Sequence, residues 1–279
     1  MRHIFILFSL MFSSACLLFA CGGGDGTAAT PPSVAAVVVT DVVYKKAAKI
    51  TVTGQHLDSG ITVTSIGCST VAEQPGGSST SRSYSCVPIF GASMDVTVSA
   101  AADKALLTQV TVPVPSPQVS LVTSLGTIVV ELRPDRAKST VDNFLEYVDS
   151  GFYNDTIFHR VVSGYVVQGG GYAVGQTTLK TTNAPILLEP PSATGLSNIQ
   201  GTIAMARSTG LNSATSQFYI NAVNNSSLDT TSGGYAVFGS VIQGMSVVTA
   251  IEAVAVDSNS WPTTAVTLTS ASRTAPSVP

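Results

Sequence analysis

Arg160 is the residue of this 279-residue chain with the clearest capacity for chemistry. It lies five residues before Tyr165 and eight before Gln168, and Gln168 runs into three consecutive glycines. An arginine stays charged and presents a planar set of N–H donors, so it can stabilise a developing charge or lone pair without any proton transfer. Two further blocks follow in order: Ser216-Gln217-Phe218-Tyr219-Ile220-Asn221, then Leu228-Asp229 with Tyr235 to Gly239.

Other kinds of catalytic site lack the residues they need in this sequence. His159 has no nucleophile elbow to serve, and His56 lies in a different segment, so we expect His159 to be buried and hydrogen-bonded. Three histidines in total leave no metal cluster, and we expect no metal. No Gly-Lys-Ser/Thr follows the glycines 169–171, which excludes a phosphate loop and favours a tight strand end.

Taken together, the three ordered blocks resemble the cyclophilin family of peptidyl-prolyl cis–trans isomerases in its compact bacterial form. The resemblance covers roughly Gln118 to Arg273. It implies an eight-stranded antiparallel β-barrel capped by two helices, proline-containing polypeptides as partners, and no cofactor. The chemistry it implies is the twisting of an X–Pro amide, in which a donor aimed at the prolyl nitrogen stabilises the transition state more than the ground state.

The resemblance also implies a role for each matching residue. Arg160 takes the catalytic position, Gln168 holds its guanidinium and the substrate backbone, and Gln217 helps to orient the substrate. Ala206 and Arg207 match the edge where the peptide lies and where a backbone N–H meets the substrate carbonyl, so the Arg207 side chain is free to vary. The proline pocket is implied to consist of Tyr165, Val166, Tyr219, Leu228 and Tyr235.

Several pocket positions depart from the family's usual residues. Tyr165 and Tyr219 stand for phenylalanines, Val166 for a methionine, and Tyr235 for the histidine common in eukaryotic members. Ser227 stands where cyclosporin-sensitive members carry tryptophan. These changes predict a shallower and more polar pocket with poor cyclosporin binding. A tyrosine hydroxyl at the pocket floor needs a hydrogen-bond partner or must point to water.

The first twenty residues have the pattern of a secretory signal, with a basic start and an apolar run. Leu18-Phe19-Ala20-Cys21 resembles the bacterial lipobox, which predicts lipidation of Cys21 and a membrane anchor made of acyl chains. An ordinary cleaved signal and an uncleaved anchor remain alternatives. Cys16 is the weaker candidate because no leucine stands at the third position before it.

Residues 21–33 are rich in Gly, Thr, Ala and Pro and predict a flexible tether. Position 22 is a glycine and not aspartate, which is the usual signal for retention in the inner membrane. We therefore expect the protein to be anchored in the outer membrane of a bacterial envelope, facing the periplasm.

Residues 34–115 predict an immunoglobulin-like β-sandwich, because short alternating stretches are separated by turn residues such as Gly54. The run Thr51 to Leu57 weakly resembles TIG-type domains. Cys68 and Cys86 predict a disulfide in an oxidising compartment. A redox pair or metal ligands are the alternatives, and they need neighbours that this segment lacks.

Alternate prolines at 113–117 predict a stiff linker before a second domain at 118–274. This domain opens with a predicted hairpin that turns at Gly126. A helix is predicted over Thr140–Val148, with Val141, Phe144, Leu145 and Val148 on one face and Gly151 at its end. A second, short helix is predicted at Ser246–Ile251. We also expect the chain to be monomeric.

The formal net charge is only −3 and no run of Lys or Arg occurs, so nucleic acid is not expected as a partner. The leading hypothesis is a tethered prolyl isomerase that assists the folding of exported proteins. The alternative is a non-catalytic peptide-binding or adhesive surface lipoprotein on the same scaffold.

Overall fold

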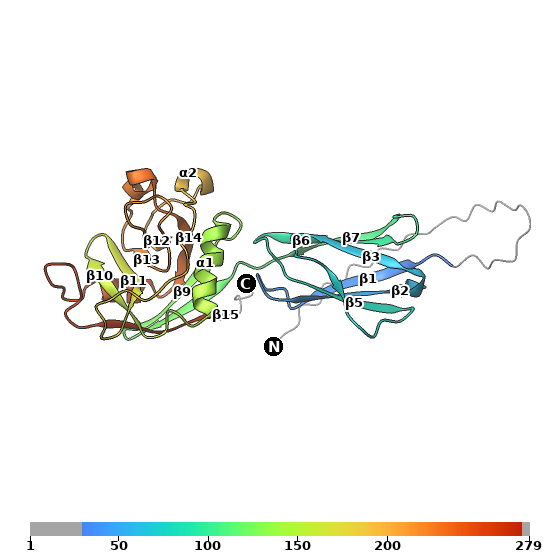
Figure 1. Ribbon diagram of the computed structural model, residues 1–279, viewed down its shortest axis with the longest axis horizontal. Coiled ribbons are helices and arrows are strands. Elements are labelled where there is room, and N and C mark those ends of the chain that lie inside the picture. Colours follow the sequence, from blue (N-terminus) through green and yellow to red (C-terminus); the bar gives the residue numbers. More distant parts are fainter. Residues whose placement is uncertain (1–29, 275–279) are drawn as a thin grey trace, which may run out of the picture. The chain divides into compact units, whose positions relative to one another are not determined.

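The computed structural model describes residues 30–274 (Figure 1). These residues belong to two compact units, and the chain passes from the first to the second between Pro115 and Ser116. The predicted signal peptide, Cys21 and most of the tether lie outside the described residues. Within the described part, no helix is long and apolar enough to cross a membrane.

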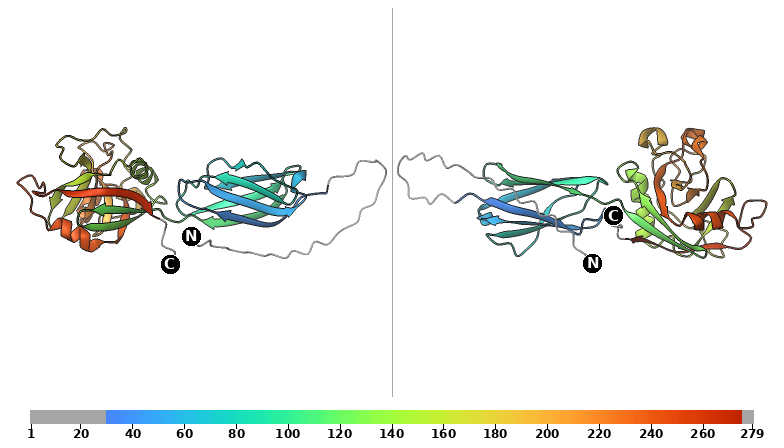
Figure 2. Two further views of the ribbon diagram at one scale, coloured as in Figure 1. Left: turned by 90° about the horizontal axis from the view of Figure 1, so that it is seen from below. Right: turned by 180° about the vertical axis from the view of Figure 1, so that it is seen from behind.

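The N-terminal unit contains two antiparallel sheets that form two layers (Figure 2). The four-stranded sheet has the order β1-β2-β5-β4, with β1 (Ser33–Thr40), β2 (Ala48–Gln55), β5 (Ser81–Cys86) and β4 (Ala72–Glu73). The three-stranded sheet has the order β3-β6-β7, with β3 (Ile61–Ile66), β6 (Ser93–Ala100) and β7 (Leu106–Pro113). Alternate residues of β2 and β6, such as Ile50, Val52, Val96 and Val98, are buried and build the core. The predicted strands are therefore present, and the immunoglobulin-like assignment of this unit stays a prediction.

Gly54 is not a turn residue, contrary to expectation. It lies inside β2 and pairs with Val34 of β1. A Cβ atom at this position would stand 1.9 Å from the carbonyl oxygen of Ser33. The glycine is therefore needed for the close approach of the neighbouring backbone.

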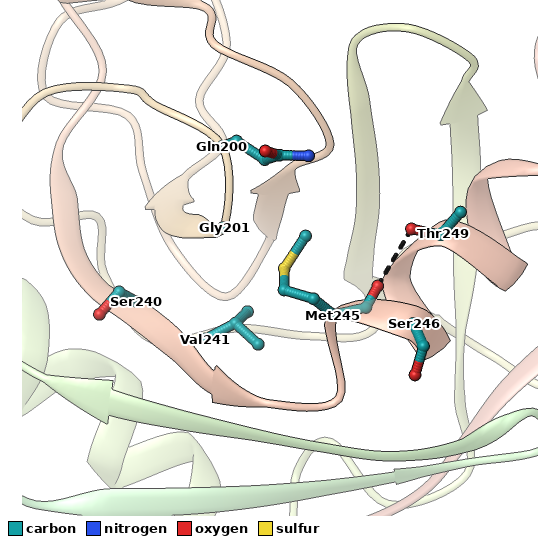
Figure 3. A pocket seen from close by; sticks show the side chains of 7 residues that line it. All are labelled: Gln200, Gly201, Ser240, Val241, Met245, Ser246 and Thr249. Atoms are coloured by element: carbon teal, nitrogen blue, oxygen red, sulfur yellow. Dashed lines mark hydrogen bonds between the residues drawn. The ribbon is translucent and has the colours of Figure 1, made fainter.

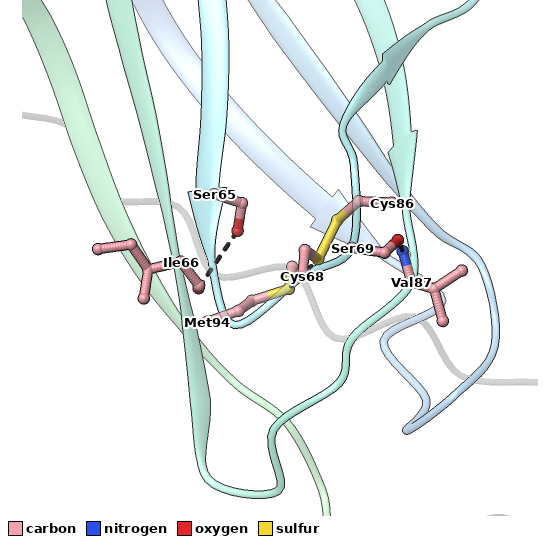
Figure 4. The surroundings of a disulfide bond; sticks show 7 residues. All are labelled: Ser65, Ile66, Cys68, Ser69, Cys86, Val87 and Met94. Carbon is pink, nitrogen blue, oxygen red and sulfur yellow. Dashed lines mark hydrogen bonds between the residues drawn. A yellow bond between two sulfur atoms is a disulfide. The ribbon is translucent and has the colours of Figure 1, made fainter.

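A disulfide joins Cys68 to Cys86, as the sequence predicts (Figure 4). Cys68 follows β3 of one sheet and Cys86 ends β5 of the other, so the bond connects the two layers. Their Cα atoms lie 5.8 Å apart, within the usual range for a disulfide. Both cysteines are buried, and the sulfur of Met94 lies 3.3 Å from that of Cys68.

The C-terminal unit is a closed antiparallel barrel of eight strands in the order β10-β11-β13-β12-β14-β9-β8-β15. The strands are β8 (Gln118–Thr123), β9 (Gly126–Leu132), β10 (Thr156–Val162), β11 (Val166–Ala173), β12 (Thr202–Met205), β13 (Phe218–Asn221), β14 (Val237–Gln243) and β15 (Val266–Thr274). The first two form the predicted hairpin, but its turn consists of Ser124 and Leu125. Gly126, expected in the turn, is the first residue of β9 and pairs with Thr123, with φ +132°. Closure leaves the barrel without an unpaired edge, as the family resemblance implies.

Two helices pack on the barrel as expected. Helix α1 (Lys138–Asp149) packs against β14 and β15, and α3 (Met245–Glu252) packs against β9, β10 and β11. The one-turn helix α2 (Pro191–Thr194) and the 3-10 turns η2 (Ser226–Asp229) and η3 (Thr231–Gly233) were not anticipated. These three short elements belong to the long loops beside the barrel, where no hydrophobic periodicity marks them.

Helix α1 shows how the sequence pattern produces the core. Its predicted apolar face is buried, and the Phe144 ring lies 5.1–5.6 Å from the rings of Tyr153, Phe218 and Phe238. The helix starts two residues earlier than predicted. Glu189 accepts hydrogen bonds from the backbone N–H groups of residues 139 and 140, which supplies partners for donors that a helix start leaves free.

Removal of residues 1–115 should leave a folded barrel, because every barrel strand begins at Gln118 or later. The truncation keeps Pro117, whose carbonyl accepts a hydrogen bond from Leu132. Trp261 is the only tryptophan of the chain and lies in the barrel unit, so its fluorescence reports this unit alone. We expect the thermal unfolding midpoint of the fragment, followed by this fluorescence, to match that of the barrel in the longer chain within a few degrees. Aggregation of the fragment would show instead that the first unit completes the core.

Candidate active site

Arg160 and Gln168 face each other across neighbouring strands. They are direct partners in the register of β10 and β11, which lie side by side in the barrel (Figure 1). The Arg160 Nη1 atom lies 3.4 Å from Gln168 Oε1, and Gln168 Nε2 donates to Gln217 Oε1 at 3.0 Å. Within residues 30–274 no carboxylate forms an ion pair with Arg160. Its remaining donors are therefore available to a ligand.

A pocket of about 250 Å³ opens beside Arg160. It brings together nine of the ten residues predicted for the site. The tenth, Gln217, does not line the pocket but accepts a hydrogen bond from Gln168. The lining residues are Arg160, Tyr165, Val166, Gln168, Ala206, Arg207, Tyr219, Leu228 and Tyr235. The buried side chains among them form one apolar cluster with Ala204 and Val237, against which Tyr165, Leu196 and Tyr235 pack. The pocket thus combines an apolar floor with two charged lining residues, Arg160 and Arg207.

The Tyr219 hydroxyl at the pocket floor has a partner inside the protein. It donates to Asn198 Oδ1 at 2.7 Å, and the tyrosine is 4% exposed. Burial raises the pKa of Tyr219 far above its ordinary value, so the side chain stays neutral. This hydroxyl therefore has the hydrogen-bond partner that a buried tyrosine needs, and the partner is a buried amide rather than water in the pocket.

Arg207 contributes its side chain as well as its backbone. Its guanidinium carbon lies 4.6 Å from the centre of the Tyr235 ring, and its nitrogens donate to the carbonyls of Ser232 and Gly234. The expectation of a freely variable side chain misses these contacts. At the same edge, the Ala206 N–H donates to the Gln217 carbonyl, whereas the Arg207 N–H has no partner in the described part of the chain. The Arg207 N–H is therefore the one that a peptide could use.

His159 is buried, as expected, and its ring lies 4.6 Å from the ring of Tyr172 and 5.8 Å from that of Trp261. Contrary to the expectation of a fully hydrogen-bonded ring, its buried Nδ1 atom has no hydrogen-bond partner among the described residues. Burial, together with the charge of Arg160, lowers the pKa of His159 to about 4, although hydrogen bonds oppose the shift. The imidazole is therefore neutral at pH 7. Its burial against the aromatic rings of Tyr172 and Trp261 describes a core histidine.

The three glycines after Gln168 lie within β11 and not at its end. Gly170 has φ +82°, and a Cβ there would stand 2.9 Å from the Tyr153 ring. A Cβ at Gly171 would stand 2.9 Å from the Cγ and Cδ atoms of Gln217. Gly171 therefore gives Gln217 the space in which it reaches Gln168.

A second cavity of about 310 Å³ lies between β14, α3 and the loop before β12 (Figure 3). Its lining residues are Gln200, Gly201, Ser240, Val241, Met245, Ser246 and Thr249. None of these side chains titrates near neutral pH, and Thr249 donates to the Met245 carbonyl of its own helix. In the part of the chain that the structure covers, no three His, Cys, Asp or Glu side chains come together in a way that could hold a metal ion.

The sequence did not indicate three residues that shape the site, Gly171, Leu196 and Asn198. Leu196 packs against the pocket cluster, and Asn198 bonds to Tyr219. Leu196 and Asn198 lie in the loop between α2 and β12, where no periodic pattern distinguishes them. The glycine run was visible, but the side chain that needs the space belongs to a distant segment.

Comparison with known families agrees with this geometry. The family described as cyclophilin type peptidyl-prolyl cis-trans isomerase matches residues 118–273, which is more than half of the chain. The chain therefore belongs to the cyclophilin-type peptidyl-prolyl cis–trans isomerases, and the barrel is its isomerase domain.

Individual relatives are similar over the same part of the chain. Peptidyl-prolyl cis-trans isomerase A of Dickeya dadantii is 49% identical over 134 residues, which cover 47% of this chain and 69% of that protein. Peptidyl-prolyl cis-trans isomerase B of Escherichia coli is 46% identical over 142 residues, which cover 49% of this chain and 85% of that protein. A crystal structure of a cyclophilin type isomerase of Cryptosporidium parvum has a TM-score of 0.49 at 23% identity, covering 57% of this chain and 98% of that one.

Proposed function

We propose that residues 118–274 accelerate the cis–trans isomerisation of X–Pro bonds in exported polypeptides, with Arg160 as the catalytic residue. The observation that carries this proposal is the hydrogen-bonded series Arg160–Gln168–Gln217 along one side of an apolar pocket. A proline ring fits such a pocket because it is apolar and compact. The relatives named as peptidyl-prolyl isomerases support the same reaction.

The reaction needs a donor rather than an acid, base or nucleophile. Amide resonance sets a barrier of ~18–20 kcal/mol, and the prolyl nitrogen gains a free lone pair as the C–N bond twists. The Arg160 guanidinium is placed at the pocket side, where it would donate to that nitrogen. The hydrogen bond would be stronger in the twisted state than in the planar one, and this difference lowers the barrier.

The other residues hold the peptide and the arginine. Gln168 would fix the guanidinium, and Gln217 would orient Gln168 from behind. The proline ring would lie over Val166, Tyr219 and Leu228, whose side chains are buried. The peptide backbone would reach the Arg207 N–H at the pocket edge.

A peptidase-coupled assay on an Ala-Ala-Pro-Phe peptide tests the proposed reaction. The peptidase cleaves only the trans form, so the slow phase reports isomerisation of the cis form. The slow phase should become faster in proportion to the protein added. A protein that binds the peptide without accelerating this phase would be the non-catalytic binding lipoprotein instead.

Gly171→Ala should lower kcat/KM by about tenfold with little change in stability, because small misplacements of a positioning side chain are costly to catalysis. The new Cβ would displace the flexible end of Gln217 and leave the backbone in place. Gly210→Ala is the matched control, since its Cβ would stand 3.5 Å from Ser213 in ordinary contact. The loss should not add to that of Gln217→Ala. Equal kcat/KM in Gly171→Ala and Gly210→Ala would contradict the role of this space.

We propose further that the chain is exported and anchored in the bacterial envelope through a lipid on Cys21, on the outer membrane facing the periplasm. The pattern Leu18-Phe19-Ala20-Cys21 after an apolar run supports the anchor. The disulfide between Cys68 and Cys86 is consistent with an oxidising compartment.

Cys21→Ser should move the protein from the washed membrane fraction to the soluble fraction, because no thioether to a lipid can form. Cys16→Ser is the matched control and should leave the protein on the membrane. Fractionation followed by immunodetection measures both. Retention of Cys21→Ser on membranes would point to an uncleaved anchor or a protein partner.

A further inference from the structure

Asn198 lies at the centre of the hydrogen bonds beneath the pocket. Asn198 is 0% exposed, and it belongs to the loop between α2 and β12 rather than to a strand. Its Oδ1 atom accepts from the Tyr219 hydroxyl at 2.7 Å and from Asn221 Nδ2 at 3.2 Å. Its Nδ2 atom donates to Asp229 Oδ1 at 2.8 Å and to the Tyr235 carbonyl at 3.3 Å. Both donors and both acceptor sites of this amide are therefore in use.

These partners come from three separate walls of the pocket. Tyr219 lies on β13 and forms the floor, while Asp229 follows the pocket residue Leu228 in η2. Tyr235 precedes β14 and packs at the rim. The Tyr235 N–H also donates directly to the Leu228 carbonyl of η2 at 3.1 Å, and the Asn198 side chain joins both of these walls to the floor residue Tyr219.

The backbone of Asn198 strengthens the same connection. Its N–H donates to Asp229 Oδ1 at 2.8 Å, and its carbonyl accepts from the Asn225 N–H at 2.8 Å. Asn225 Nδ2 in turn donates to the carbonyl of Tyr165, another lining residue. Burial alone would raise the pKa of Asp229, but hydrogen bonds from Ser197 and Asn198 hold it below its ordinary value. The carboxylate therefore stays ionised and remains a strong acceptor for the amide.

We propose that Asn198 is a positioning residue of the proline pocket, which holds Tyr219, η2 and Tyr235 in the arrangement that receives the proline ring. The proposal rests on the proposed function, because it assigns the preformed shape of the same pocket to one buried amide. Asn198 does not line the pocket, and it lies apart from the Arg160–Gln168–Gln217 series. Its loss should therefore act on peptide binding rather than on the donor at the prolyl nitrogen.

Asn198→Ala tests this role through the Kd of an Ala-Ala-Pro-Phe peptide, measured by NMR titration of the full chain. We expect the Kd to rise about tenfold, because several buried partners lose their bonds at once and the pocket loses its preformed shape. Thr156→Val is the matched control. Thr156 is also 0% exposed and bonds to the Tyr153 carbonyl at 2.6 Å, but it contributes nothing to the pocket lining. Its Kd should stay within about twofold of wild type.

Two gentler variants keep the test decisive if Asn198→Ala does not fold. Asp229→Ala removes the carboxylate at a partly exposed position and should raise the Kd by about threefold, since one wall is released. Tyr219→Phe removes one hydroxyl and leaves Asn221 on the amide oxygen, so the Kd should change less than in Asp229→Ala. Equal Kd values for wild type and Asp229→Ala would overturn the proposal.

Methyl NMR separates this proposal from the proposed function. Leu228 and Val166 line the pocket, whereas Val119 and Leu121 lie in the core at the β8 side of the barrel. In Asn198→Ala or Asp229→Ala the Leu228 methyl resonances should shift or broaden while those of Val119 and Leu121 stay in place. Unchanged Leu228 resonances would refute the role of Asn198. A wild type that neither binds nor isomerises the peptide would refute the proposed function alone, and the methyl result would still decide on Asn198.

Discussion

Arg160→Ala should lower kcat/KM by roughly 10²–10³, on the scale observed when one preorganised donor is removed from an active site. The apolar pocket stays in this variant, so the Kd of the ground-state peptide should change little. The same coupled assay and an NMR titration measure the two quantities. The expected separation between kcat/KM and Kd follows because the donor acts on the nitrogen only as the amide twists.

Neighbouring substitutions sharpen this result. Arg160→Lys should recover only part of the activity, because an ammonium lacks the planar fork of donors. Gln168→Ala should lose less than Arg160→Ala, and the two losses should not add, because the side chains are in contact.

Arg273→Ala is the matched control for loss of an arginine. Arg273 lies in the same barrel, where it pairs with Asp149 at 2.6 Å, away from the pocket. Its replacement should leave kcat/KM near that of wild type. If Arg160→Ala keeps wild-type kcat/KM with an unchanged CD spectrum, the catalytic assignment is wrong.

Loss of the disulfide should destabilise the N-terminal unit by about 3 kcal/mol, the chain-entropy value for a loop of this size. The two cysteines are 18 residues apart, and the bond connects the two sheets. The double variant Cys68→Ser, Cys86→Ser should therefore show a lower free energy of unfolding in urea when far-UV CD follows the N-terminal transition. That change corresponds to about a hundredfold in the unfolding equilibrium.

The chain carries its own control for this experiment. Trp261 is in the barrel and the N-terminal unit has no tryptophan, so fluorescence follows the barrel transition alone. This transition and the isomerase activity should stay as in wild type. A reducing agent added to wild type should reproduce the CD shift. An unchanged CD transition in the double variant would show that the bond adds no stability to the two sheets.

Local relations in the chain were predictable because short-range geometry fixes them. The apolar face of α1 follows from the helical period, and the hairpin of β8 and β9 follows from two alternating runs around Gly126. Arg160 and Gln168 come together for a similar reason, since their strands are joined by a tight turn and pair directly. The sequence by itself therefore determined the main local elements through short-range geometry, and its ordered motifs indicated the barrel and the pocket residues through their resemblance to the cyclophilin family.

Contacts between distant segments were decided only by the tertiary structure. Whether the Tyr219 hydroxyl faces the pocket or the interior depends on Asn198, which is 21 residues away and in a loop without a periodic pattern. Gly171 matters because of Gln217, and Gly54 because of the backbone of Ser33, which approaches from another strand. A buried polar group takes whichever partner the closed barrel brings within hydrogen-bond distance, and residue type and spacing do not specify that partner.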